Sequence, residues 1–345
     1  MPLSRFPRLT LAHLPTPLEP LERLGDHLAG QPGGGPRLYV KRDDCTGLAS
    51  GGNKTRKLEF LLAEALEQGC DTIVTEGGRQ SNHVRQTAAA AARLGLACEL
   101  VLQEAHFWDD PDYDVSGNIF LDRLLGATLH GVACEADRKS GMARVAEAIT
   151  RRGGKPYVIP AGGSTALGGL GYAGCAFEIA AQAETLGITV DHIVLASGSG
   201  GTQGGLVAGL LAIADGGGGA IPALGIDIDA DPEGVPARVR AVAEGTAGLL
   251  DVTGGVPLSA VAVNSDYAGQ AYGAPTEAMV EAVTLLARLE GLLLDPVYSG
   301  KAMAGLIDLV RRGFFAADDT VVFIHTGGLP ALFAYRGAFE DLRLE

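Results

Sequence analysis

The segment 51–57 has the residue types expected around a lysine with a reactive amine. Lys54 follows two glycines and an asparagine, and residues 54–57 carry three cations at the start of an expected helix, where the helix dipole disfavours positive charge. Such a run is most often a solvated basic face. The glycines before Lys54 favour instead a lysine held in a cleft, and a desolvated lysine amine can form a Schiff base with an aldehyde. Lys54 is therefore the candidate nucleophile.

A second pattern recurs at four expected strand-to-helix junctions, where paired glycines and a small polar residue follow an apolar strand. The junctions lie at 75–82, 160–164, 196–205 and 325–328. Glycines leave backbone N–H groups free to face a ligand, and the helix N-terminus adds partial positive charge, so these junctions are typical of a phosphate site. The third junction is the richest, and its candidate phosphate ligands are Ser199, Gly200, Gly201 and Thr202. At some of the four, the glycines could serve tight turns alone.

A lysine in a cleft and a phosphate cradle together indicate a phosphorylated aldehyde, and pyridoxal 5′-phosphate (PLP) is the cofactor of that type. The rival is a dinucleotide loop, since Gly198 and Gly200 follow a strand and Asp227 ends the next one. The third glycine of that motif is out of register, which makes a nicotinamide enzyme the weaker hypothesis. No strand is followed by the lysine motif of a P-loop, so a nucleotide triphosphate site is excluded.

These residues need a frame, and the hydrophobic pattern predicts an α/β fold of two open, twisted, mainly parallel sheets flanked by helices. The expected strands are 72–75, 97–103, 156–160, 193–196, 221–227 and 321–325. The expected helices are 53–68, 82–94, 118–125, 144–152, 173–185, 205–214, 276–290 and 305–312. We predict a small domain at 52–162 and a large PLP-binding domain at 1–51 plus 163–345, where the first residues form an extended, proline-rich arm. A cleft between the sheets would hold the ligand.

Composition narrows the function classes. The chain of 345 residues has a net charge of −14, which argues against nucleic acid or an anionic membrane surface as a partner. No apolar run is long enough for a membrane span, and the proline-rich N-terminus does not resemble a signal peptide. The five cysteines form no CxxC pair, as expected of reduced thiols in a cytoplasmic protein, and no metal site is predicted.

Five blocks, spread over nearly the whole chain, resemble the 1-aminocyclopropane-1-carboxylate (ACC) deaminase / D-cysteine desulfhydrase family. The blocks are Lys41-Arg-Asp-Asp44, Gly51-Gly-Asn-Lys-Thr-Arg-Lys-Leu-Glu59, Gln80-Ser-Asn-His-Val-Arg-Gln86, Asp295-Pro-Val-Tyr-Ser-Gly-Lys301 and His325-Thr-Gly-Gly328. The resemblance implies PLP as cofactor, the tryptophan-synthase-β-like fold (PLP fold type II), a small amino-acid substrate and a homodimer.

The resemblance also implies roles for single residues. For the cofactor, Lys54 matches the Schiff-base lysine, Asn82 the residue that bonds the ring hydroxyl, residues 199–202 the phosphate loop, and Thr326 a further cofactor contact. The matches on the substrate side are Ser81, Asn82 and His83, in the loop that receives the carboxylate, and the active-site tyrosines Tyr272 and Tyr298. The expected catalytic set is Lys54, Ser81, Tyr272 and Tyr298.

Two positions separate the subclasses of this family. ACC deaminases resemble one another in an acidic residue after the Pro-Val-Tyr tyrosine, where this chain has Ser299, and desulfhydrase-like members share a threonine at Thr326. Without that carboxylate the cofactor ring nitrogen is largely neutral and withdraws electrons weakly, which suits a readily leaving thiolate or sulfite better than cyclopropane opening. We therefore predict a PLP-dependent carbon–sulfur lyase of the D-cysteine desulfhydrase type, and an ACC deaminase is less favoured.

Three alternatives remain at this point. Residues 201–204 and 264–269 resemble L-cysteate sulfo-lyases, and Arg79 could pair a sulfonate, although a loop arginine facing solvent is the simpler interpretation. A non-enzymatic PLP carrier or small-anion-binding protein could use the same cradle. A nicotinamide oxidoreductase is the third alternative.

Overall fold

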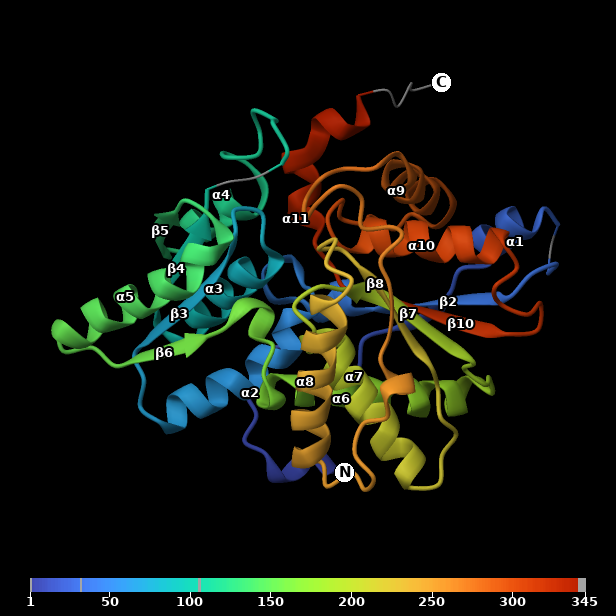
Figure 1. Cartoon of the computed structure of the whole chain (residues 1–345), viewed down its shortest axis with the longest axis horizontal. Helices are drawn as coiled ribbons and strands as arrows, with labels where there is room; N and C mark the ends of the chain where they lie inside the picture. The colour runs from blue at the N-terminus through green and yellow to red at the C-terminus, as the bar shows by residue number, and fades with distance from the viewer. Residues whose placement is uncertain (1, 32, 105–106, 341–345) are drawn as a thin grey trace.

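Two sheets, one of six strands and one of four, frame the molecule in a computed structural model that describes residues 2–31, 33–104 and 107–340 (Figure 1). The six-stranded sheet has the order β1-β2-β10-β7-β8-β9, and only its β1–β2 pair is antiparallel. Its strands are β1 (Leu18–Pro20), β2 (Arg37–Arg42), β7 (His192–Ser197), β8 (Ala223–Asp227), β9 (Ala262–Asn264) and β10 (Thr320–His325). All six residues of β10 are buried, as expected of a central strand covered on both faces.

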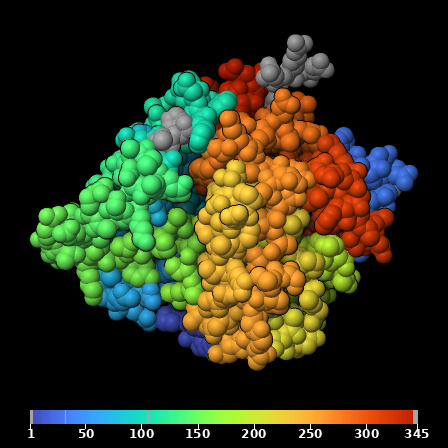
Figure 2. Space-filling view, in the orientation of Figure 1, coloured from blue at the N-terminus to red at the C-terminus, as the bar shows by residue number. Residues whose placement is uncertain are grey.

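The four-stranded sheet is parallel throughout, with the order β5-β4-β3-β6. Its strands are β3 (Thr72–Gly78), β4 (Ala97–Gln103), β5 (Thr128–Val132) and β6 (Pro156–Ile159). Its elements are cyan to green in the space-filling view and lie beside the yellow-to-orange part of the chain that follows β8 (Figure 2). The predicted fold class, two mainly parallel sheets flanked by helices, is confirmed.

The helices are α1 (Glu22–Ala29), α2 (Lys54–Glu67), α3 (Asn82–Leu94), α4 (Gly117–Leu124), α5 (Arg138–Arg151), α6 (Ala166–Leu186), α7 (Gly201–Asp215), α8 (Gly234–Leu249), α9 (Glu277–Glu290), α10 (Ser299–Arg311) and α11 (Leu329–Leu332). On one side of the six-stranded sheet lie α1, α9 and α10, and on the other lie α6, α7 and α8 (Figure 1). No helix within the described ranges combines the length and apolar character that crossing a bilayer requires.

Helix α3 illustrates why the sequence folds as it does near the site. Ser81 caps its N-terminus by accepting a hydrogen bond from the Val84 N–H at 3.4 Å, and Gly95 ends it in the left-handed conformation. Between these caps lies a run of alanines, the residue with the highest helix propensity. The helix N-terminus is therefore fixed at residue 82, four residues after Gly78, which ends β3.

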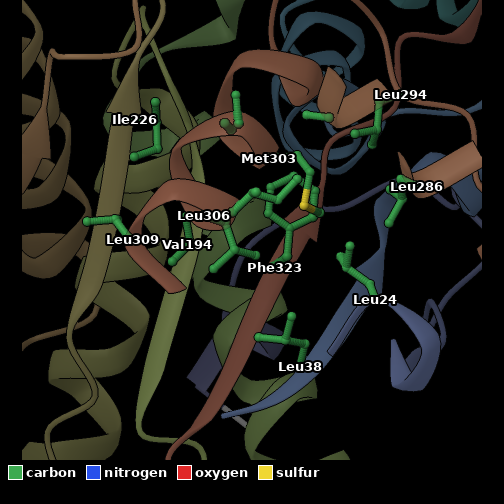
Figure 3. Close-up of a cluster of buried hydrophobic side chains, with 14 of the residues drawn as sticks. Leu24, Leu38, Val194, Ile226, Leu286, Leu294, Met303, Leu306, Leu309 and Phe323 are labelled. Atoms are coloured by element: carbon green, nitrogen blue, oxygen red, sulfur yellow. The ribbon is translucent and has the colours of Figure 1, made fainter. Parts of the chain in front are cut away.

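A hydrophobic core between α10 and the six-stranded sheet fixes the position of α10. Met303, Leu306 and Leu309 point from this helix toward side chains of the strands, among them Val194 and Phe323 (Figure 3). Burying a side chain of this size contributes about 1.5–3 kcal/mol. This packing therefore holds the first turn of α10 in a fixed position next to the site.

Four helices begin four or more residues earlier than the sequence predicts. The predicted starts at 144, 173, 205 and 305 become 138, 166, 201 and 299 in α5, α6, α7 and α10. The added turns of α6 and α7 are rich in glycine and that of α10 begins with a serine and a glycine, which are poor helix formers, and tertiary packing overrides that preference. The shift matters at α7 and α10 because their true first turns lie in the site.

Other elements are absent from the prediction. It missed β5, a partly exposed strand at the sheet edge, and α8. The prediction of an extended arm before residue 52 is wrong in part, because that segment contains α1 and two strands of the large sheet. The division into domains at 52–162 and at 1–51 plus 163–345 remains a proposal, with which the strand ranges of the two sheets agree.

Candidate active site

The four glycine-rich junctions meet around the start of α2. A Cβ atom built on Gly328 would lie 2.6 Å from Asn82 Nδ2, so the junctions after β10 and β3 touch. Ser164 Oγ lies 2.8 Å from Ser199 Oγ and accepts a hydrogen bond from the Gly201 N–H at 3.1 Å, so the junctions after β6 and β7 also touch. The carboxyl ends of strands from both sheets therefore converge on one place, where α/β proteins bind ligands.

Lys54 opens α2 and lines a cavity at this meeting point. The other lining residues are Asn53, Asn82, Ala196, Ser197, Gly198, Ser199, Gly200, Thr202, Gln203, Tyr298 and Thr326. Seven of the residues predicted for the site are therefore in one cavity: Lys54, Asn82, Ser199, Gly200, Thr202, Tyr298 and Thr326. The remaining four, Ser81, His83, Gly201 and Tyr272, lie next to it.

The Lys54 amine sits in a weakly solvated environment. It donates a hydrogen bond to Asn53 Oδ1 at 3.0 Å and lies 5.8 Å from the centre of the Tyr298 ring. Burial lowers the pKa of Lys54 to about 8, an effect that nearby Asp295 opposes and Arg85 adds to. A substantial fraction of this amine is therefore neutral near physiological pH, the form that attacks an aldehyde.

The start of α7 forms a cradle that depends on two glycines. Gly200 has a φ of +84°, and a Cβ on it would lie 2.6 Å from the Arg238 carbonyl carbon. A Cβ on Gly201 would lie 2.7 Å from Lys57 Nζ. Only glycine at these positions leaves the helix N-terminus open beside the amine of Lys57.

Lys57 is a functional candidate that the sequence analysis left unassigned. Its side chain is fully buried, its Nζ donates to the Gly162 carbonyl at 3.0 Å, and within the described ranges neither it nor Lys54 forms an ion pair. The nearby Ser197 Oγ lines the cavity and is buried without a hydrogen-bond partner. Two amines, an unpartnered hydroxyl and a helix N-terminus together fit an anionic group such as a phosphate.

Asn82 and Ser81 hold the opposite wall at the start of α3. Asn82 Oδ1 accepts a hydrogen bond from Asn118 Nδ2 at 2.8 Å, which fixes the amide so that it faces the cavity. The Ser81 hydroxyl caps the helix and still has a proton to donate. The N–H groups of this helix N-terminus are a suitable receptor for a carboxylate.

The His83 side chain is buried and does not line the cavity. Thr75 Oγ1 donates to the Ile159 carbonyl at 2.8 Å, so the 2.8 Å contact between Thr75 and His83 must have His83 Nε2 as its donor. Burial, together with the charges of Lys54 and Lys57, holds the pKa of His83 well below its usual value. The imidazole is therefore neutral, and a contact with substrate through the backbone of this residue remains a prediction.

Two tyrosines close the cavity on the side of α10. The hydroxyls of Tyr272 and Tyr298 are 2.6 Å apart, and the rings pack edge to face. Burial raises the pKa of both phenols, so both keep their protons at neutral pH. The pair can therefore deliver a proton to a group that develops negative charge.

Asp295 fixes the loop that presents Tyr298. Its carboxylate accepts hydrogen bonds from the N–H groups of Val297, Tyr298 and Ser299, at 2.8–3.1 Å. The Ser299 hydroxyl donates to the same carboxylate at 2.6 Å and accepts from the Asp295 N–H at 2.9 Å. The hydroxyl of Ser299 is thus engaged with Asp295, and Ser299 does not line the cavity, whereas Thr326 does.

Two residues behind the alternative hypotheses have other partners. Asp227 is fully buried and accepts from the N–H groups of Asp229 and Asp231 and from the Ser265 hydroxyl, so it is not free to bind a ribose. Arg79 lies 3.3 Å from a carboxylate oxygen of Asp114. Neither lines the cavity, which weakens the nicotinamide and sulfonate interpretations.

Sequence reasoning missed Asn53, Lys57 and Asp295. Lys57 had a signal, since residues three apart on a helix share a face and Lys54 was already assigned. Asn53 joins the two halves of the site, because its Nδ2 donates to Thr202 Oγ1 at 2.9 Å while its Oδ1 accepts from Lys54. Asn53 and Thr202 are far apart in the sequence, so no local pattern predicts the hydrogen bond between them.

Comparisons with known proteins agree with this geometry. A match to the family described as pyridoxal-phosphate dependent enzyme spans residues 9–327. The chain is 47% identical to proteins named 1-aminocyclopropane-1-carboxylate deaminase from Burkholderia vietnamiensis and from Burkholderia multivorans, over 99% of this chain and 100% of each relative.

Among solved structures, the chain is similar to one described as an ACC deaminase homologue. The TM-score is 0.87 at 36% identity, and the match covers 99% of this chain and 98% of the other. An Escherichia coli diaminopropionate ammonia lyase has a TM-score of 0.65 at 18% identity, over 96% of this chain and 87% of that one. At that identity the likeness shows a shared fold alone.

Proposed function

Since the chain belongs to the family of pyridoxal-phosphate dependent enzymes, with the tryptophan-synthase-β-like fold, we propose that it is a carbon–sulfur lyase that converts D-cysteine to pyruvate, ammonia and sulfide. The observation that carries the choice of reaction is the wall of the cavity. Within the described ranges, none of its lining residues bears a carboxylate.

The residues present fit PLP. Lys54 would hold the aldehyde, and the start of α7 with Thr202 would hold the phosphate beside Lys57. Asn82 and Thr326 would contact the ring. When bound, PLP supplies a covalent attachment for the substrate amine and an aromatic ring that withdraws electrons from Cα.

Protein groups would handle the protons. The Lys54 amine, with its lowered pKa, is the candidate base that takes the Cα proton. As the carbon–sulfur bond breaks, a phenol proton from Tyr272 or Tyr298 would pass to the departing sulfur. The N-terminus of α3, with the Ser81 hydroxyl, would hold the substrate carboxylate. The enamine product then takes up water and gives pyruvate and ammonia.

The missing carboxylate supports sulfur elimination. A carboxylate beside the ring nitrogen would stabilise its protonated form and strengthen electron withdrawal, whereas a hydroxyl does this weakly. At this wall the chain places Thr326, while the Ser299 hydroxyl is engaged with Asp295. A thiolate leaves readily and tolerates weak electron withdrawal, but opening a cyclopropane ring does not.

ACC deamination is the second candidate, because the relatives at 47% identity are named for it. The test is a panel of D-cysteine, L-cysteine, L-cysteate and ACC, with pyruvate, sulfide, sulfite and 2-oxobutyrate measured for each. We expect equal amounts of pyruvate and sulfide from D-cysteine at the highest kcat/KM of the panel. A higher kcat/KM for 2-oxobutyrate from ACC would reject the proposal, and sulfite from L-cysteate as the main product would assign the sulfo-lyase alternative.

The lowered pKa of Lys54 predicts how the apoprotein captures its cofactor. With a pKa of about 8, about a tenth of the amine is neutral at pH 7, whereas a lysine with the ordinary pKa of 10.5 would be only about 0.03% neutral. The rate of capture should therefore rise with pH and level off above about pH 8. Stopped-flow absorbance of apoprotein mixed with PLP measures this rate, and a rise that continues to pH 10 would contradict the assignment.

The predicted homodimer and cytoplasmic location are part of the same proposal. All five cysteines are unpaired, as a reducing compartment would keep them. Light scattering on the eluting holoenzyme would give the mass of the assembly.

A further inference from the structure

The loop that carries Tyr272 is held on both sides of that residue. The carbonyl of Ala271, just before it, accepts a hydrogen bond from Lys301 Nζ at 3.1 Å. The carbonyl of Gly273, just after it, accepts one from the Tyr335 hydroxyl at 3.0 Å. Two side chains from later parts of the chain therefore determine where the phenol of Tyr272 lies.

Lys301 makes the more unusual of these contacts. Its side chain is fully buried, and its Nζ also donates to the Ala268 carbonyl at 2.6 Å. Within the described ranges it forms no ion pair, and burial lowers its pKa to about 8, although the carboxylates of Asp229, Asp227 and Asp295 favour its charged form. An ammonium group buried against backbone carbonyls costs free energy that an apolar side chain would not. Packing alone therefore does not explain a lysine here.

The place of Lys301 on α10 connects it to the site. It follows Tyr298, the residue that caps the N-terminus of α10, by three residues, so both lie at the first turn of this helix. Tyr298 reaches the cavity directly, and Lys301 reaches the loop whose Tyr272 hydroxyl lies 2.6 Å from that of Tyr298. One turn of α10 thus positions both phenols relative to each other.

We propose that Lys301 is a positioning residue, which holds the 265–275 loop so that the Tyr272 hydroxyl stays in contact with Tyr298 and can serve the leaving group. Lys301 does not line the cavity and would act only through Tyr272. This inference rests on the proposed function for the role of Tyr272, but the loop contact itself does not depend on the substrate.

A double-mutant cycle on the holoenzyme tests the inference, with Lys301→Met, Tyr272→Phe and the double variant, assayed on the panel substrate that wild type converts fastest. Alone, Lys301→Met should lower kcat about 10- to 100-fold with little change in KM, because loss of a supporting contact misplaces the phenol. In the Tyr272→Phe background it should lower kcat by no more than about 3-fold. Hydrogen exchange at residues 265–275 should increase in Lys301→Met and not in the exposed control Lys139→Met.

Equal losses of kcat in the two backgrounds would overturn the proposal, as would unchanged exchange at 265–275. If Lys301→Met does not fold, Lys301→Gln, which keeps an N–H donor, goes through the same cycle. Full turnover in Tyr272→Phe would reject the role given to that phenol in the proposed function, and hydrogen exchange would still decide whether Lys301 holds the loop.

Discussion

Replacing Lys54 with alanine should lower turnover by roughly four orders of magnitude. It should also remove the near-visible absorbance of the lysine-bound cofactor, because no other residue can supply both the attachment to the cofactor and the base. The variant should fold as wild type does, since Lys54 forms no ion pair within the described residues and its amine donates to its neighbour Asn53. Steady-state kinetics and an absorbance spectrum of the purified protein measure both effects.

Lys54→Arg is the matched control for this prediction. It keeps the charge and much of the length but cannot form the linkage, so it should be as inactive as Lys54→Ala. A Lys54→Ala protein that keeps both colour and turnover would show that another amine does the work, and the buried amine of Lys57 would be the first to examine.

Replacing Asp43 with alanine should destabilise the protein by about 3–5 kcal/mol, because the buried Arg56 guanidinium loses one of its two carboxylate partners and keeps only Glu178. Asp43 is fully buried and accepts hydrogen bonds from Arg56, Thr16 and Tyr172, at 2.5–2.8 Å. Arg56 follows Lys54 by two residues, so this network also anchors the helix that presents the amine. Denaturant unfolding, monitored by circular dichroism, gives the difference in free energy of unfolding.

The effect of Asp43→Ala should depend on pH. Burial opposes ionisation, but the Arg56 charge and the hydrogen bonds outweigh it and hold the pKa of Asp43 below the ordinary value of 3.8. A carboxylate with a lowered folded pKa stabilises above its unfolded pKa and loses that contribution as the pH falls. The gap between wild type and variant should therefore shrink below about pH 4. The exposed ion pair of Glu281 with Arg311 is the control, and Glu281→Ala should cost no more than about 1 kcal/mol.

The local sequence was sufficient to predict those residues of the cavity wall whose neighbours in the chain form a recognisable pattern. Lys54 could be predicted because two glycines precede it, and the α7 cradle because Ser199 and Thr202 flank glycines that follow a strand. The fold class followed from the alternation of strands and helices.

Contacts between distant segments could not be predicted in this way. Asp43 and Tyr172 are 129 residues apart, and the Lys57 amine reaches Gly162 across 105 residues. The hydrophobic pattern gives each element its buried face but not the element it packs against, so the buried ionic network and the contact of Lys57 with Gly162 emerge only from the three-dimensional fold.

The first turns of α7 and α10 show a different limit. Both begin with glycine or serine, which favour loops on their own, and the prediction therefore started these helices several residues too late. Packing of α10 on the sheet stabilises its first turn, and Asp295 binds the exposed N–H groups there. Helix starts of this kind are common at binding sites because they leave N–H groups free.

Borohydride reduction of the holoenzyme, followed by peptide mapping, tests directly whether Lys54 is the residue that binds the cofactor. Reduction makes the lysine linkage permanent, and mass spectrometry then locates the modified residue among the three lysines with lowered pKa, which are Lys54, Lys57 and Lys301. We predict one pyridoxyl phosphate group per chain, on Lys54. A pyridoxyl phosphate group on Lys57 or Lys301 would contradict the assignment of Lys54. The absence of any such group from a coloured enzyme that turns over substrate would contradict it as well.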